Sequence, residues 1–147
     1  MRYGSTRRLV VREKGALLAE EEYRALADFR HEIRRFQAFS EAHASKVGLT
    51  PQQHQALLAI RAADADQATV GYIAERLILK AHSATGLVDR LDALDLIIRE
   101  VSPDDRRRTL LRLTPKAYDI LASLSAVHRE EIRRLRPLLL EIFDKFD

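Results

Sequence analysis

Residues 69–113 read TVGYIAERLILKAHSATGLVDRLDALDLIIREVSPDDRRRTLLRL, and the local signals in them establish the architecture. Thr69 is suited to cap a short helix whose apolar residues, between positions 73 and 77, recur at helical spacing. A second helix is predicted from about Ala81 to Leu94, again with apolar residues on one face. The first half of these residues therefore predicts two short helices joined by a tight turn.

The second half predicts a β-hairpin. Residues 96–101 and 109–113 are short apolar runs rich in β-forming residues, and the turn-forming residues 102–105 separate them. Three consecutive arginines, Arg106, Arg107 and Arg108, follow that turn. A helix pair followed at once by a hairpin is a winged helix-turn-helix, in which the second helix can enter the major groove of DNA and the hairpin can reach the backbone.

Long amphipathic helices are predicted on both sides of this unit. From Glu20 to Val47, apolar residues recur every three or four positions until Gly48 ends the pattern. A capping box with proline at the first helical position opens the next helix at residues 50–53. Beyond the hairpin, Thr114 and Pro115 begin another long helix, and Pro137 either kinks it or begins a sixth helix. The expected fold is mainly α with a small β-hairpin, in one domain spanning residues 1–147.

Composition narrows the class of protein. The chain has 147 residues, 46% hydrophobic and 32% charged, which suits a soluble, helix-rich domain with its own core. It has no cysteine, so disulfides, thiolate metal sites and thiol redox sensing are excluded. We expect a cytoplasmic protein, since the sequence contains neither an apolar stretch long enough to span a bilayer nor a signal-peptide pattern. The net charge of +3 is compatible with nucleic-acid binding.

The first 19 residues are interpreted as a basic N-terminal arm. Residues 1–14 contain five Lys or Arg residues and one glutamate, and their apolar residues show little periodicity. We expect this arm to add to DNA affinity, or to cross to a partner subunit.

The stretch from Leu49 to Leu121 resembles the MarR family of bacterial and archaeal regulators. The similarity lies in five short motifs, which occur in the same order as in the family: LTPQQ at 49–53, TVGYIAERL at 69–77, LVDRL at 87–91, SPDDRR at 102–107 and LTP at 113–115. The resemblance implies a homodimer with helices 20–48 and 114–147 interlocked between subunits, and residues 50–113 as the winged helix-turn-helix. The apolar side chains of the last helix suit such pairing: Leu139, Ile142, Phe143 and Phe146.

By this resemblance, the protein is a sequence-specific duplex-DNA-binding transcription regulator, a repressor that a small-molecule effector releases from a palindromic operator. Asp105 and Arg107 look like the family's wing pair, in which an aspartate orients an arginine that meets the DNA. The turn 78–81 departs from the family's frequent glycine and Ser-Pro start, and Gly86 stands where arginine is frequent. Base reading is therefore assigned to smaller groups. The residues predicted to bind DNA are His82, Ser83, Thr85, Gly86, Arg90, Asp105, Arg106, Arg107 and Arg108.

Relatives in this family often bind small aromatic acids between the dimerisation helices and the winged domain. In this chain such a cleft would draw on Phe36, Phe39, His43, Leu57 and Arg61, which serve equally well as core residues.

Two other classes of function compete with this one. An enzyme is not expected, because the five histidines are scattered and no metal-ligand spacing, phosphate loop or nucleophile elbow is present; no cofactor or catalytic residue is predicted. A regulatory metal site shared between subunits is a remoter alternative. The chief alternative is a winged-helix protein-interaction module without DNA binding, since fold alone does not decide function.

Overall fold

The computed structural model describes residues 17–147, so residues 1–16 of the predicted arm lie outside the described residues. The chain is mainly α-helical with one small antiparallel hairpin, as predicted. The elements in order are α1 (Glu20–Lys46), α2 (Pro51–Ala62), α3 (Val70–Leu77), α4 (Ala81–Ala93), β1 (Ile97–Val101), β2 (Thr109–Leu113), α5 (Pro115–Phe143) and the 3-10 turn η1 (Asp144–Phe146).

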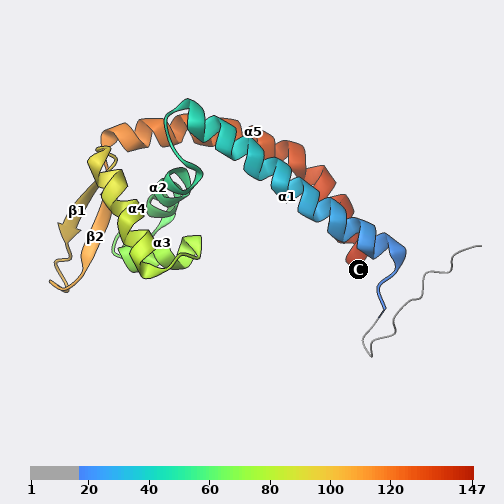
Figure 1. Cartoon of the computed structure of the whole chain (residues 1–147), viewed down its shortest axis with the longest axis horizontal. Coiled ribbons are helices and arrows are strands. Elements are labelled where there is room, and N and C mark those ends of the chain that lie inside the picture. Colours follow the sequence, from blue (N-terminus) through green and yellow to red (C-terminus); the bar gives the residue numbers. More distant parts are fainter. Residues whose placement is uncertain (1–16) are drawn as a thin grey trace, which may run out of the picture.

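The molecule is an arch with two unlike ends (Figure 1). At one end, α2, α3, α4 and the hairpin form a compact unit under the first half of α5. At the other end, α1 and the second half of α5 run side by side as a two-helix stalk. The stalk helices are antiparallel, so the start of α1 lies beside the end of α5 and η1.

Local sequence signals begin three of the helices as predicted. The hydroxyl of Thr50 accepts a hydrogen bond from the Gln53 N–H at 3.2 Å, and the Thr50 N–H donates to Oε1 of the Gln53 side chain at 3.0 Å. Thr69 caps α3 and Thr114 caps α5 in the same way, each by accepting the N–H of the residue three positions further on. These caps fix where α2, α3 and α5 begin.

The turn between α3 and α4 uses an unusual residue for its geometry. Ile78 has φ 54° and ψ 51°, the left-handed conformation in which glycine usually ends a helix. The N–H of Leu79 reaches back to the carbonyl of Ala74 at 2.8 Å, which satisfies one of the last carbonyls of α3. The sequence departure at this position therefore does not prevent the tight turn.

The hairpin pairs β1 with β2 antiparallel, with Ile97 opposite Leu113 and Val101 opposite Thr109. Residues 110, 111 and 113 of β2 are buried, whereas β1 beyond Ile97 is exposed. The N–H of Leu111 also donates to the carbonyl of Ala68 at 2.7 Å, which ties the loop before α3 to the outer edge of β2. The hairpin thereby belongs to the same compact unit as the helix pair.

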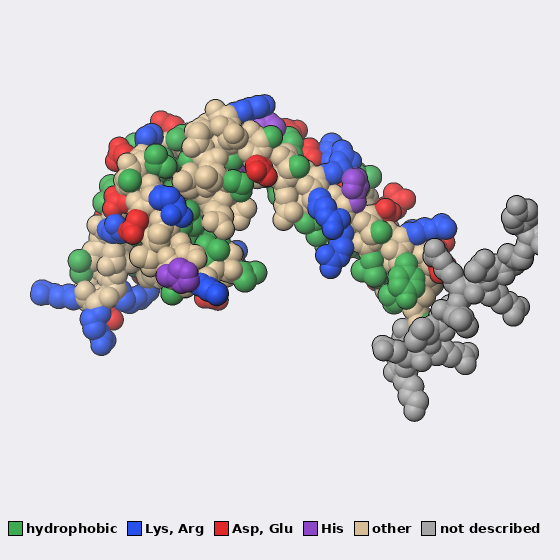
Figure 2. All heavy atoms as spheres, in the orientation of Figure 1, with side chains coloured by type: hydrophobic (Ala, Val, Ile, Leu, Met, Phe, Trp, Pro, Cys, Tyr) green, Lys and Arg blue, Asp and Glu red, His purple; other side chains and the backbone are tan. Residues whose placement is uncertain are grey.

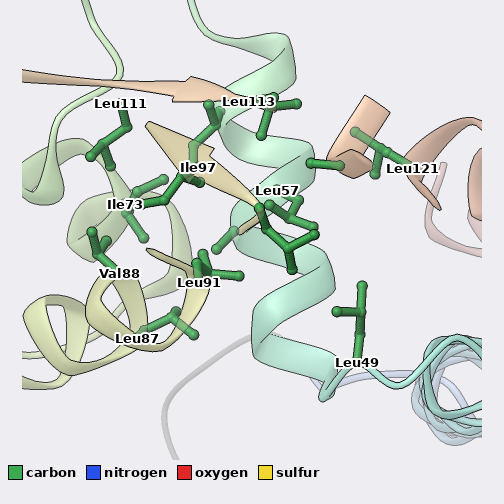
Figure 3. Packing of buried hydrophobic residues seen from close by; sticks show 14 of the residues in the cluster. Leu49, Leu57, Ile73, Leu87, Val88, Leu91, Ile97, Leu111, Leu113 and Leu121 are labelled. Atoms are coloured by element: carbon green, nitrogen blue, oxygen red, sulfur yellow. The ribbon is translucent and has the colours of Figure 1, made fainter. Parts of the chain in front are cut away.

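The hydrophobic core lies within this winged unit (Figure 3). Leu57 of α2, Ile73 of α3 and Leu91 of α4 are fully buried in it, together with residues of the hairpin and the start of α5. Burying each such side chain stabilises the fold by roughly 1.5–3 kcal/mol relative to leaving it in water. This core holds α4 and the hairpin in a fixed relative position.

The sequence interpretation of the last helix needs two corrections. Pro137 lies inside α5, which continues unbroken to Phe143, so the described residues 17–147 contain no sixth α-helix. An interior proline costs one intrahelical hydrogen bond and crowds the carbonyl four residues before it, but α5 packs against α1, and Leu135 and Ile142 on either side of Pro137 are buried. Of the four apolar side chains expected to pair with a partner subunit, Ile142 is buried within the monomer and Leu139 is half-buried, while Phe143 and Phe146 are exposed.

The stalk buries little of its own apolar surface. A pair of antiparallel helices shares only one stripe of contact, so apolar residues outside that stripe remain exposed. The large apolar side chains exposed on the stalk are Tyr23, Leu26, Ile33, Ile132, Leu140, Phe143 and Phe146. Within residues 17–147, no helix is both long and apolar enough to cross a membrane.

Candidate nucleic-acid interface

Helix α4 presents the side chains predicted to read bases. His82 and Thr85 are exposed and Ser83 is partly exposed, while Ala84 and Leu87 fix the opposite face of the helix in the core. The Thr85 hydroxyl donates to the Ala81 carbonyl of its own helix at 3.1 Å and keeps its lone pairs free to accept. The structure therefore brings these three residues together on the first turns of α4.

Arg90 lies beside the glycine at position 86. A Cβ added at Gly86 would lie 3.5 Å from Arg90 Nη1, so the guanidinium of Arg90 lies back over the previous turn of α4. A cation thus stands next to the position where the resemblance leads us to expect arginine. The sequence pointed to both residues but did not show that one covers the other.

The turn of the hairpin is organised by Asp105. Its carboxylate oxygen Oδ1 accepts the N–H of Arg107 at 3.0 Å and Arg107 Nε at 3.3 Å, and its carbonyl accepts the N–H of Arg108 at 3.0 Å. Ser102, which is buried, closes the turn with its N–H bonded to the Arg108 carbonyl at 2.9 Å. The side chain of Arg107 remains 92% exposed, so the aspartate orients a cation that is open to solvent.

The three arginines of the hairpin are not equivalent. All three are exposed, but Arg108 Nη2 also donates to the Asp66 carbonyl at 2.9 Å. Arg112, which sequence reasoning did not assign, bonds the Ala65 carbonyl in the same loop. Arg108 and Arg112 therefore brace the hairpin against the loop before α3, and Figure 2 shows Lys and Arg gathered at that end of the molecule.

A second brace, also missed in the sequence, joins the hairpin to α4. Arg99 of β1 forms ion pairs with Asp89 and Asp92 of α4, the latter at 2.7 Å. Because all three side chains point between the two elements, they restrict the angle between α4 and the hairpin. Only their pairing in space reveals this role, since in sequence they are ordinary surface charges.

The residues of the predicted effector cleft lie in three places. Leu57 is fully buried in the core of the winged unit. Arg61 stacks on the Tyr118 ring, 4.8 Å from its centroid, beside a separate hollow of about 210 Å³ between α2, β2 and α5. Phe39 and His43 line an open hollow against α5, and Phe36 lies nearby, against His128. The five side chains do not share one cavity.

Comparison with known proteins decides the family. The family model described as MarR family matches residues 47–108. The HTH-type transcriptional regulator MhqR of Bacillus subtilis is 33% identical over 99 residues, which cover 67% of either chain. The chain belongs to the MarR family. The resemblance seen in residues 49–121 is confirmed, and with it the interpretation of the fold as that of a winged helix-turn-helix transcription regulator.

Several solved structures share the fold. A probable transcriptional regulator from Pseudomonas aeruginosa is 31% identical, with a TM-score of 0.61, over 80% of this chain and 87% of that one. The Staphylococcus aureus MepR–DNA complex has a TM-score of 0.65 at 22% identity, over 76% and 81%. BpsR of Bordetella bronchiseptica, whose DNA binding is regulated by 6-hydroxynicotinic acid, has a TM-score of 0.61 at 20% identity, over 80% and 89%.

Proposed function

We propose that this MarR-family protein is a sequence-specific, duplex-DNA-binding transcription regulator that acts as a homodimer in the cytoplasm. The observation that carries the proposal is the exposed first half of α4 beside an arginine-tipped hairpin, both anchored in one rigid core. An α-helix fits the major groove, and a neighbouring hairpin then reaches the flanking backbone. The likeness to the MepR–DNA complex supports the fold required.

The residues on this surface contribute to DNA binding in different ways. His82, Ser83 and Thr85 supply small polar groups that can meet base edges, and Arg90 adds a cation on the same helix. Arg106 and Arg107 are exposed cations at the end of the hairpin and serve as phosphate ligands. Arg108 serves chiefly by holding the hairpin against Asp66.

The stalk supports a two-fold dimer. Apolar side chains of α1 and of the second half of α5 are exposed, and in an isolated monomer they would face water at a cost in free energy. A hollow of about 300 Å³, lined mostly by charged side chains, also lies between the start of α1 and the end of α5. We infer that the second copy of the chain covers the exposed apolar side chains and places the two α4 helices on one face of the duplex.

The proposed regulation is repression that a small aromatic acid relieves. BpsR offers a precedent within the same fold, because its DNA binding is regulated by such an acid. In this chain, an open hollow lies between α1 and the middle of α5. Phe39, His43 and Arg134 line it with an aromatic ring, an imidazole and a guanidinium group. Those groups suit a planar carboxylate. Arg134 is also paired with Glu131, so a bound carboxylate would have to share or displace that partner.

The test is selection of duplexes from a random-sequence library by the purified protein, followed by measurement of affinity against salt. A regulator of this kind should recover a palindromic sequence and lose affinity steeply as salt rises, because counterions are released with each phosphate contact. Absence of duplex binding, together with capture of a defined protein, would favour the interaction-module alternative. Addition of aromatic acids to the bound complex then tests release.

A further inference from the structure

Three histidines from three different helices meet where the stalk joins the winged unit. The ring centroid of His128, on α5, lies 4.9 Å from that of His54 on α2 and 6.3 Å from that of His43 on α1. Phe36 and Phe39 of α1 pack edge-on against the His128 ring, at 6.0 and 5.5 Å. These histidines are scattered in the sequence, and the proposed DNA interface uses none of them.

The hydrogen bonds of His128 define its neutral state. Its Nδ1 lies 2.7 Å from the Leu124 carbonyl, which can only accept, so Nδ1 carries a proton. Its Nε2 lies 2.8 Å from the Ser40 hydroxyl, which donates to it when the ring is neutral. A second proton on His128 would force that hydroxyl to turn round and accept instead.

His54, unlike His128, has a buried ring nitrogen without a hydrogen-bond partner among residues 17–147. That nitrogen is Nδ1, and the His54 side chain is 4% exposed. Burial and then the proximity of His128 lower the pKa of His54 below the ordinary value for histidine. A charge on either ring would therefore be placed in an aromatic contact that holds α2 against α5.

We propose that the His54–His128 contact is acid-sensitive. It holds the stalk and the winged unit in the DNA-binding arrangement only while both rings are neutral. The inference rests on the proposed DNA-binding function. Taking up a proton introduces a charge that is relieved when α2 moves away from α1 and α5. Because α2 packs directly on α3 and α4, such a movement shifts the recognition helix relative to the stalk.

The charged groups around the pair agree with this arrangement. On α5, Glu131 is an anion near His128, but Arg134 is bonded to it, lowers the pKa of Glu131 and offsets its negative charge. On α1, His43 faces His128, and its Nδ1 is held by the Phe39 carbonyl at 2.9 Å. Arg35 of α1 acts on Glu131 from the other side. Within the described part of the chain, no anionic group stabilises the charged form of His54.

The sign of the pH effect follows from the lowered pKa of His54. The unfolded chain takes up a proton at the ordinary histidine pKa of about 6.5, and the folded chain resists it to a lower pH. Stability from this group is therefore complete above that value and is lost as pH falls toward the folded pKa. DNA affinity should fall over the same interval.

The experiment measures duplex affinity and the urea unfolding midpoint between pH 7.5 and 5.5, using full-length protein and the duplex chosen by library selection. Each linked proton can change affinity by up to about tenfold per pH unit, so we expect wild-type affinity to fall at least about fivefold. His54→Gln should reduce that fall to about twofold or less, because the titrating ring is gone. Gln55→Ala, at an exposed and non-titrating residue next to His54 on α2, is the control and should behave as wild type.

His128→Gln serves as the second variant should His54→Gln fail to fold, and it should flatten the pH dependence in the same way. The inference is overturned if the folded variants keep the wild-type dependence of affinity and of the urea midpoint. Failure to bind duplex at any pH overturns the proposed function instead. The urea midpoint would still decide the histidine contact, since wild type and the control should lose more stability than the His54 and His128 variants as the pH falls.

Discussion

Ile78 holds a backbone conformation that disfavours its own side chain. Its φ is +54°, and the isoleucine is 93% exposed, so the left-handed geometry is not offset by burial. A β-branched residue in this region costs roughly 1–2 kcal/mol, because its Cβ crowds the following carbonyl. The turn persists because the bond from Leu79 to Ala74 and the packing of α3 and α4 determine it.

Ile78→Gly should therefore raise the free energy of unfolding by about 1 kcal/mol, measured by urea denaturation. Asp95→Gly is the matched control: Asp95 also has a positive φ, +58°, but aspartate tolerates that region, so the gain should be smaller. A loss of stability on Ile78→Gly would show that relief of the strain is smaller than the conformational freedom that glycine adds to the unfolded chain.

Among the secondary-structure elements, the hairpin is a braced arm with a free cationic end. Asp105 shapes the turn, Arg108 and Arg112 hold it to the loop before α3, and Arg99 holds it to α4. Each exposed ion pair adds little stability by itself. Their value is that Arg107 meets DNA already positioned, so less conformational entropy is sacrificed on binding.

Arg107→Ala should weaken binding to all duplexes by a similar factor. The slope of log affinity against log salt should become shallower by about 0.9 for each phosphate that the variant no longer neutralises. Arg129→Ala removes the same charge from an exposed site on α5, away from the hairpin, and should leave the slope nearly unchanged. An unaltered slope in Arg107→Ala would place the hairpin outside the interface.

The arch as a whole has one end with a complete core and one end without. The stalk exposes apolar side chains on both of its helices, which a second stalk would cover. Leu140→Glu, at a residue 47% exposed near the end of α5, should convert the dimer to monomer and abolish tight operator binding. Sedimentation velocity measures this directly.

Ile98→Glu provides the comparison, because Ile98 is 50% exposed but lies on the outer face of β1. It should leave the protein dimeric. A Leu140→Glu protein that still sediments as a dimer would show that the subunits meet elsewhere.

A two-fold dimer also predicts the form of its operator. Two α4 helices on one face of the duplex require half-sites centred about one helical turn apart, roughly 10 bp. Inserting about 5 bp turns one half-site to the opposite face, so affinity should collapse in a gel-shift assay, and an insertion of about 10 bp should restore part of it at most. Equal affinity for a single half-site and the full operator would contradict the dimer.

The elements and their order could be predicted from the amino-acid sequence. Local signals decide where helices begin and which face is apolar, so the caps at Thr50, Thr69 and Thr114 and the hairpin around residues 102–105 were visible in the chain alone. The family followed from motifs within 49–121, which depend on the same local patterns. The residues placed on α4 and the hairpin stay predictions of DNA contact.

Contacts between side chains far apart in the sequence, in contrast, became visible only in the folded chain. Arg90 over Gly86, Arg108 on Asp66 and the meeting of His54 with His128 join residues whose separation in sequence carries no signal. The same holds for Pro137, which packing against α1 keeps inside a continuous helix, and for Leu57, which lies in the core and not in a cleft. A local pattern limits what a segment can form, but the burial and pairing of its side chains depend on which other segments pack against it.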